Sequence, residues 1–169
     1  RKVQGVPVEI ALPPNIEDFL NGRHRMVDVN KCVSAFNIPV RSVHAPHGHL
    51  ADATFKTWAP GIIGFAASVG AEIVVFHPEQ CSDNNCINLH STVLHNMKYV
   101  QSRTRITVAV ETFWDQPCVL MPEEIMDHRL PMVLDTSRIP KTEITWIIES
   151  YHTHIVNLHL SAVDPGSSR

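Results

Sequence analysis

The chain has 169 residues, of which 44% are hydrophobic and 18% are charged. This length fits one domain over residues 1–169, and the composition supports a buried core and excludes wholesale disorder. No apolar run approaches the roughly 18 residues that a membrane span needs, and the first residues do not resemble a signal peptide. The four cysteines form no CxxC motif, which favours reduced thiols in a cytoplasmic protein. The net charge of −3 argues against a protein that coats nucleic acid.

Six short apolar segments, rich in β-branched residues, are predicted to be strands. Most of them are almost continuously apolar, which is typical of parallel strands that are covered on both faces. In chain order they are Val6–Ile10, Val40–His44, Glu72–His77, Ile106–Glu111, Met132–Asp135 and Ile155–Ser161.

Longer amphipathic stretches separate these segments and predict helices. The clearest is Thr57–Val69, where Trp58 and Phe65 share one apolar face and Gly70 follows as a C-cap. The other predicted helices are Asn15–Phe19, Met26–Ala35, His90–Gln101, Pro122–His128 and Thr142–Tyr151. Alternation of strands and helices predicts an α/β fold built from βαβ units, either a doubly wound sheet or a TIM barrel.

Five of the predicted strands carry a metal-ligand type of residue at their carboxyl end. These residues follow one another at intervals of 24 to 34 residues, close to the roughly 30 residues of one unit of a (β/α) barrel. In a barrel the carboxyl ends form a ring around one mouth, whereas an open sheet would spread them apart. The spacing therefore favours the barrel. The five residues are His44, His77, Glu111, Asp135 and His159.

The chemistry of these side chains indicates a transition-metal site. Imidazole together with carboxylate suits Zn²⁺, Mn²⁺ or Fe²⁺, and zinc or manganese is the ion we expect. A single histidine at a strand end is usually a structural residue. Five candidates at the same end of successive strands, at regular intervals, indicate one shared site.

Five short segments resemble, in this order, the xylose isomerase-like TIM-barrel superfamily, which includes endonuclease IV and the sugar-phosphate isomerases and epimerases. They are VHAP at 43–46, GAEIVVFHP at 70–78, VET at 110–112, LDTS at 134–137 and LHLS at 158–161. The resemblance runs from Val6 to Ser161 and implies a barrel of this type.

The resemblance implies a role for each candidate ligand. His44 and His77 look like the histidines that bind one metal in endonuclease IV. Glu111 looks like the glutamate that bridges metals there and acts as ligand or acid/base in the isomerases, so it is the candidate catalytic residue. Asp135 and His159 are similar to ligands found in both branches.

The sequence departs from the family pattern at two places. The family motif Asp-Thr-Ser-His ends here in Arg138, which cannot bind a cation but suits a phosphate or carboxylate. A third zinc of the endonuclease IV type is therefore not expected. Nothing supplies the family's glutamate on an eighth strand. By this count strands two to seven are present, about six of eight βα units, so the chain is either a piece of a longer polypeptide or a shortened barrel that closes by another route such as a homodimer.

Three further residues are candidate substrate contacts. Arg138 and His47 follow strand ends and suit a phosphate or hydroxyl, and Glu9 lies near the end of the first strand.

Three functions remain open. The first is a metal-dependent isomerase or epimerase of a small sugar or sugar phosphate, which would use metal-assisted proton transfer. The second is an endonuclease IV-like phosphodiesterase on abasic DNA, which the pair His44 and His77 favours and the thin supply of Lys and Arg disfavours. The third is a non-catalytic barrel relative.

Overall fold

The computed structural model describes residues 5–78, 86–114 and 119–160. The strands are β1 (Val8–Ala11), β2 (Val40–His44), β3 (Ile73–Phe76), β4 (Thr107–Thr112), β5 (Met132–Asp135) and β6 (Ile155–His159). The helices are α1 (Ile16–Asn21), α2 (Arg23–Phe36), α3 (Phe55–Ser68), α4 (Cys86–Gln101), α5 (Pro122–Asp127) and α6 (Ile144–Tyr151), with a 3₁₀ turn, η1, over Thr136–Arg138.

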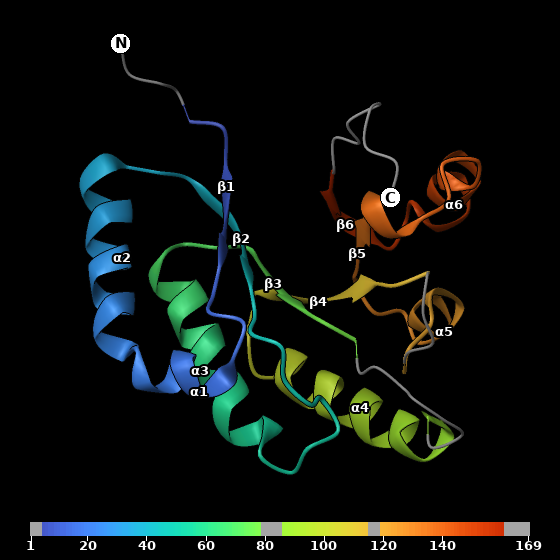
Figure 1. Cartoon of the computed structure of the whole chain (residues 1–169), viewed down its shortest axis with the longest axis horizontal. Coiled ribbons are helices and arrows are strands. Elements are labelled where there is room, and N and C mark those ends of the chain that lie inside the picture. Colours follow the sequence, from blue (N-terminus) through green and yellow to red (C-terminus); the bar gives the residue numbers. More distant parts are fainter. Residues whose placement is uncertain (1–4, 79–85, 115–118, 161–169) are drawn as a thin grey trace, which may run out of the picture.

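The six strands form one parallel sheet in the order β1-β2-β3-β4-β5-β6. A doubly wound sheet reverses its strand order at a switch point, and this sheet never does. The prediction of a barrel rather than a doubly wound sheet is therefore confirmed. The strands curl, and the helices form an arc around the outside of the curl (Figure 1). The barrel is incomplete, because β1 and β6 are the two edges of the described sheet.

Each predicted strand and helix is present, with ends that shift by a few residues. The first strand was predicted from Val6, but Val6 is exposed and pairing begins at Val8, because Pro7 has no backbone N–H to donate. The last strand ends at His159, and Ser161 lies outside the described residues. The turn η1 was not predicted. In the described part of the chain no helix is long and apolar enough to cross a membrane.

The main hydrophobic core lies between the convex face of the sheet and the helices. Outward side chains of the central strands, such as Val74 and Phe76, are fully buried. They pack against the apolar face of α3, which includes Trp58 and Phe65 as predicted. Gly70 ends this helix at φ 74°, where the amide of Ala71 donates to the carbonyl of Ala66. This is the glycine C-cap that the sequence predicted.

A second, small apolar cluster fills the concave face of the sheet. It consists of Ile73, Val75, Ala109 and Val133, with Val156 packed against it. Side chains inside a barrel stack in layers, and this cluster is the apolar layer. The side chains nearer the carboxyl ends of the strands are polar, and they form the candidate site.

Candidate metal centre

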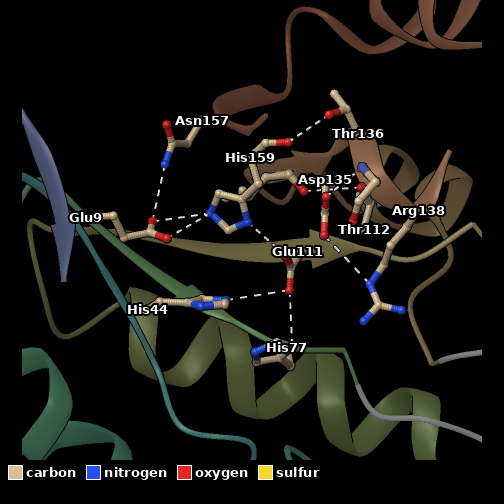
Figure 2. Close-up of polar contacts among 12 residues, drawn as sticks. Glu9, His44, His77, Glu111, Thr112, Asp135, Thr136, Arg138, Asn157 and His159 are labelled. Carbon is tan, nitrogen blue, oxygen red and sulfur yellow. Dashed lines mark hydrogen bonds and ion pairs between the residues drawn. The ribbon is translucent and has the colours of Figure 1, made fainter. Parts of the chain in front are cut away.

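Five side chains from five neighbouring strands meet at the carboxyl edge of the curled sheet (Figure 2). They come from the end of β2, the residue after β3, the interior of β4, and the ends of β5 and β6. Parallel strands bring their carboxyl ends to one edge, and the curl turns these ends toward one another. The structure thus brings together all five residues predicted as ligands: His44, His77, Glu111, Asp135 and His159.

Glu111 lies at the centre of this group and is only 3% exposed. His159 Nδ1 is 2.8 Å from Glu111 Oε1 and in hydrogen-bonding alignment. On the other carboxylate oxygen, Oε2, His77 Nδ1 lies at 3.1 Å and His44 Nε2 at 3.6 Å. One buried carboxylate therefore contacts three imidazoles.

Three atoms of this group are buried and have no hydrogen-bond partner. They are His44 Nε2, His77 Nδ1 and Glu111 Oε2, which face one another without the alignment of a hydrogen bond. Buried polar atoms are almost always paired, so three unpaired ones at a single point require an explanation. A divalent cation would satisfy all three, and their chemistry, two imidazole nitrogens and a carboxylate oxygen, fits zinc or manganese.

A second set of ligand atoms overlaps the first. Glu111, Asp135 and His159 each offer an atom within 4.8 Å of the others, as do His44, His77 and Glu111. Glu111 is common to both sets. The mouth can therefore hold a metal ion at either of two adjacent positions, or at both.

Glu9 contacts this centre from the far edge of the sheet. Its Oε1 lies 3.0 Å from His159 Nε2, so the imidazole of His159 is held between two carboxylates. The hydroxyl of Ser42 donates to Glu9 Oε2, and the amide of Asn157 lies within 3.5 Å of the same oxygen. These hydrogen bonds join side chains from β1, β2 and β6, and they fix the position of Glu9 beneath the mouth.

These contacts shift the pKa values of the site. Burial alone would raise the pKa of Glu111, but the hydrogen bond from His159 and the nearby His44 and His77 hold it well below its usual range. Hydrogen bonds to Glu111 and Glu9 raise the pKa of His159 to about 10, against the effect of burial. Burial likewise opposes the lowered pKa of Glu9, which His159 and Ser42 maintain by hydrogen bonds. Without a metal, His159 is thus an imidazolium between two carboxylates.

Asp135 and Arg138 occupy the rim of the mouth beside η1. Asp135 Oδ1 accepts a hydrogen bond from the Ser137 amide and caps the turn, and Oδ2 lies 3.7 Å from Arg138 Nε. The guanidinium of Arg138 lies over the ring of Phe113, 4.0 Å from its centroid. The arginine predicted as a substrate contact is therefore held close to a candidate metal ligand.

His47 lies beside His77 at the mouth. Its ring stacks on that of His77, with centroids 3.8 Å apart. Burial and the neighbouring His77 lower the pKa of His47, which favours its neutral form. His47 also lines an open pocket of about 500 Å³ with Asn15, His49 and Trp58.

Three residues of the site were missed by sequence reasoning. Ser42 and Asn157 lie two positions before His44 and His159, and a period of two places them on the same face of their strands. That signal was present but was not used. Phe113, which supports Arg138 and lies near the ring of His77, carries no signal in the sequence.

No protein-family model and no curated protein sequence matches this chain. Several solved structures do. An AP endonuclease of family 2 from Brucella melitensis matches at 14% identity with a TM-score of 0.73, over 98% of this chain and 72% of that one. The 3-keto-D-glucoside 4-epimerase YcjR from E. coli matches at 13% identity and TM-score 0.63, over 80% of this chain and 63% of the epimerase. A xylose isomerase domain protein from Planctomyces limnophilus matches at 13% identity and TM-score 0.62, over 90% of this chain and 62% of that one.

Proposed function

We propose that this chain, which has the fold of the xylose isomerase-like TIM barrels in incomplete form, is a divalent-metal-dependent enzyme. The observation that carries the proposal is the convergence of three buried, unpaired ligand atoms of His44, His77 and Glu111 in the mouth. A structural site would close the coordination sphere with protein ligands, whereas this one lies at the mouth, where the His44 side chain is 19% and the His159 side chain 20% exposed. Substrate can therefore reach it.

Isomerisation or epimerisation of a small sugar or sugar phosphate is the reaction we propose first. A bound divalent ion would polarise a substrate oxygen, whether of a carbonyl, a hydroxyl or a phosphate. Proton transfer between carbon atoms needs an ionised base that takes the proton from one carbon and an acid that returns a proton to the substrate. Glu111 is the ionised carboxylate, and His159 with Glu9 behind it can hold a proton at the imidazole.

The charge of the mouth also favours a small polar substrate. Glu9, Glu111 and Asp135 bring three carboxylates to it, and Arg138 brings one guanidinium. With His159 protonated, a single divalent ion leaves this set with one excess positive charge, which suits one phosphate group better than the many of a polyanion such as DNA. Arg138 and His47, both at the mouth, are proposed to hold the phosphate or hydroxyl groups of the substrate.

Hydrolysis of a phosphodiester in abasic DNA is the second candidate, and one observation favours it. The two overlapping ligand sets share Glu111, and a pair of ions bridged in this way is the arrangement that clamps a phosphate during in-line displacement. Two ions would also make the mouth more strongly positive. The number of bound ions therefore separates the two reactions.

The first experiment measures the metal content of the purified protein beside that of Glu111→Gln, with Glu17→Gln as an exposed control. About one or two equivalents of zinc or manganese, lost in Glu111→Gln and kept in the control, is the expected result. A wild-type protein that takes up no metal on titration would overturn the metal-dependent function and favour the non-catalytic relative.

The second experiment identifies the reaction. The loaded protein is incubated in D₂O with a panel of sugars and sugar phosphates, and in parallel with a duplex that contains an abasic site. Incorporation of deuterium at carbon, absent in Glu111→Gln, supports the isomerase. Cleavage of the duplex by the two-metal form without deuterium incorporation supports the phosphodiesterase instead. A homodimer and a cytoplasmic location remain predictions, which light scattering and fractionation test.

A further inference from the structure

We propose that the pocket beside His47 is a subsite for a second hydroxylated ring, so that the substrate is a glycoside whose reacting sugar carries another sugar unit. The inference rests on the proposed function, because it assigns the reacting sugar to the metal centre of the mouth. The pocket has a volume of about 500 Å³, which lies within the range of small-molecule sites.

The pocket begins one side chain away from the metal centre. His47 lines the pocket, and its ring stacks on that of His77, whose Nδ1 faces Glu111. A ligand in the pocket and a ligand at the metal centre would therefore both lie beside the imidazole of His47. A glycosidic bond joins two sugar rings through a single oxygen atom, so the two rings of one disaccharide can occupy neighbouring sites of this kind.

Two loops form the pocket, and backbone hydrogen bonds join them. The amide of His47 donates to the carbonyl of Pro14 at 2.8 Å, and Asn15 and His47 form an isolated parallel bridge. Within the second loop the amide of Asp52 donates to the carbonyl of His49 at 3.0 Å. The loops that follow β1 and β2 are therefore held together before a ligand binds, which lowers the entropy lost on binding.

Apolar side chains form one part of the lining. Pro14, Ile16 and the edge of the Trp58 indole contribute carbon atoms to it. Gly48 lets the second loop lie directly against this indole, since a Cβ atom at that position would be only 2.9 Å from Trp58 Cζ2. One face of a sugar ring presents mainly C–H groups, and such a face packs on apolar and aromatic side chains.

Polar side chains form the rest of the lining, and two of them are fixed by backbone amides. Asn15 Oδ1 accepts a hydrogen bond from the amide of Glu17 at 2.8 Å, and Asp52 Oδ1 accepts one from the amide of Thr54 at 2.7 Å. A side-chain amide and a carboxylate each have the capacity for further hydrogen bonds. The hydroxyl groups of a sugar both donate and accept, so they match this mixed set.

The charge of the lining favours a neutral ring over a phosphate group. Asp52 is acidic, and hydrogen bonds from Thr54 hold the pKa of its carboxyl below the usual range. The described residues that line the pocket include no lysine or arginine. A phosphate in the pocket would therefore meet a carboxylate without a compensating cation. Where the substrate carries a phosphate, we expect that group at Arg138.

Calorimetric titration of the metal-loaded protein tests the subsite. Glucose, galactose and fructose are compared with four disaccharides built from them: maltose, cellobiose, lactose and sucrose. We expect at least one disaccharide to bind at least about tenfold more tightly than its component monosaccharides. Thr54→Phe places an aromatic ring in the pocket and should abolish this difference. Thr57→Phe adds the same ring at an exposed residue of α3 outside the lining, and it should keep the difference.

A second variant keeps the test sound if Thr54→Phe disturbs folding. Asp52→Asn retains an oxygen for the Thr54 amide but removes the charge, and it should weaken disaccharide binding about three- to tenfold. In NMR spectra of the wild type, the amide signals of Gly48 and Asp52 should shift more with the disaccharide than with the monosaccharides.

The outcomes separate this inference from the proposed function. If monosaccharides bind and no disaccharide binds more tightly, or if Thr54→Phe and Asp52→Asn both keep the wild-type difference, the subsite is overturned and the sugar reaction stands. If the metal-loaded protein binds neither class of sugar, the proposed sugar reaction is overturned and the subsite with it.

Discussion

Glu9 Oε1 lies 3.0 Å from His159 Nε2, although the two residues belong to β1 and β6, the opposite edges of the sheet. Two strands with four others between them cannot touch in a flat sheet, because adjacent strands are about 4.8 Å apart. The contact therefore depends on the curl, and it joins the two edges through the polar interior. It also makes the pKa of His159 depend on a residue of β1.

Replacing Glu9 by glutamine should lower the pKa of His159 from about 10 toward its ordinary value of 6.5, because one of its two carboxylate partners is lost. We also expect activity to fall about 10–100-fold, the usual effect of removing a partner that orients a ligand. NMR titration of the histidine ring protons in the metal-free protein measures the first effect. The control is Glu17→Gln, at an exposed residue of α1. An unchanged His159 titration in Glu9→Gln would contradict the contact.

The metal-free protein should lose stability as the pH rises from 6.5 to about 10. The folded-state pKa of His159 is above its unfolded value, so its contribution is complete below pH 6.5 and is lost as the pH rises through about 10. The pKa of Glu111 is lowered, so its contribution is present above pH 4.5 and is lost as the pH falls. Between pH 4.5 and 6.5 both contributions are present.

Urea unfolding in the presence of a chelator, measured across this range, checks the prediction. In Glu111→Gln the decline between pH 6.5 and 10 should become shallower, because His159 keeps only Glu9 as a carboxylate partner. A wild-type stability that rises over this interval would show that His159 is not held as an imidazolium.

Arg138→Gln should raise KM for a phosphorylated substrate and leave KM for the unphosphorylated sugar nearly unchanged. The guanidinium offers paired, charged donors to a phosphate, and the shorter, uncharged glutamine does not. Arg138→Lys keeps the charge but loses the fork and the stacking on Phe113, so it should recover only part of the affinity. Equal increases in KM for both substrates would assign Arg138 a structural role beside Asp135.

Gly70→Ala should destabilise the protein by about 1–2 kcal/mol, the cost of a left-handed backbone for a residue with a Cβ atom. No atom lies within 4 Å of the added methyl group, so strain at φ 74° is the only cost. Gly64→Ala is a matched control inside α3, where the methyl also meets nothing within 4 Å. That substitution should stabilise by about 0.5–1 kcal/mol, since alanine favours a helix over glycine. Thermal unfolding of both variants measures the difference in sign.

The parts of the fold that the sequence predicted are those with a strong local signal. The buried run Ile73–Phe76 has no polar residue. The end of α3 at Gly70 depends on one positive φ angle, which glycine adopts without strain. The intervals between His44, His77 and Glu111 predicted that these side chains meet. In a barrel, residues one βα unit apart in the chain lie at the ends of adjacent strands, around one mouth.

The remaining features depend on how far the sheet curls, which local sequence does not encode. The approach of Glu9 to His159 is one example, since it joins residues at the two ends of the sheet. The stacking of His47 on His77 and of Arg138 on Phe113 are others, because loop conformation decides both. Side-chain pairs of this kind are set by tertiary packing rather than by periodicity.

The pairing register of β5 and β6 places Asp135 directly beside His159 on adjacent strands. The distance between these two candidate ligands is therefore set by the backbone hydrogen bonds between β5 and β6, which substitutions in the loops leave in place. Arg138 and His47 lie outside the strands of the sheet. If the proposed function holds, substrate preference can change by loop substitution while the candidate metal ligands keep their separation, so the two properties can evolve independently.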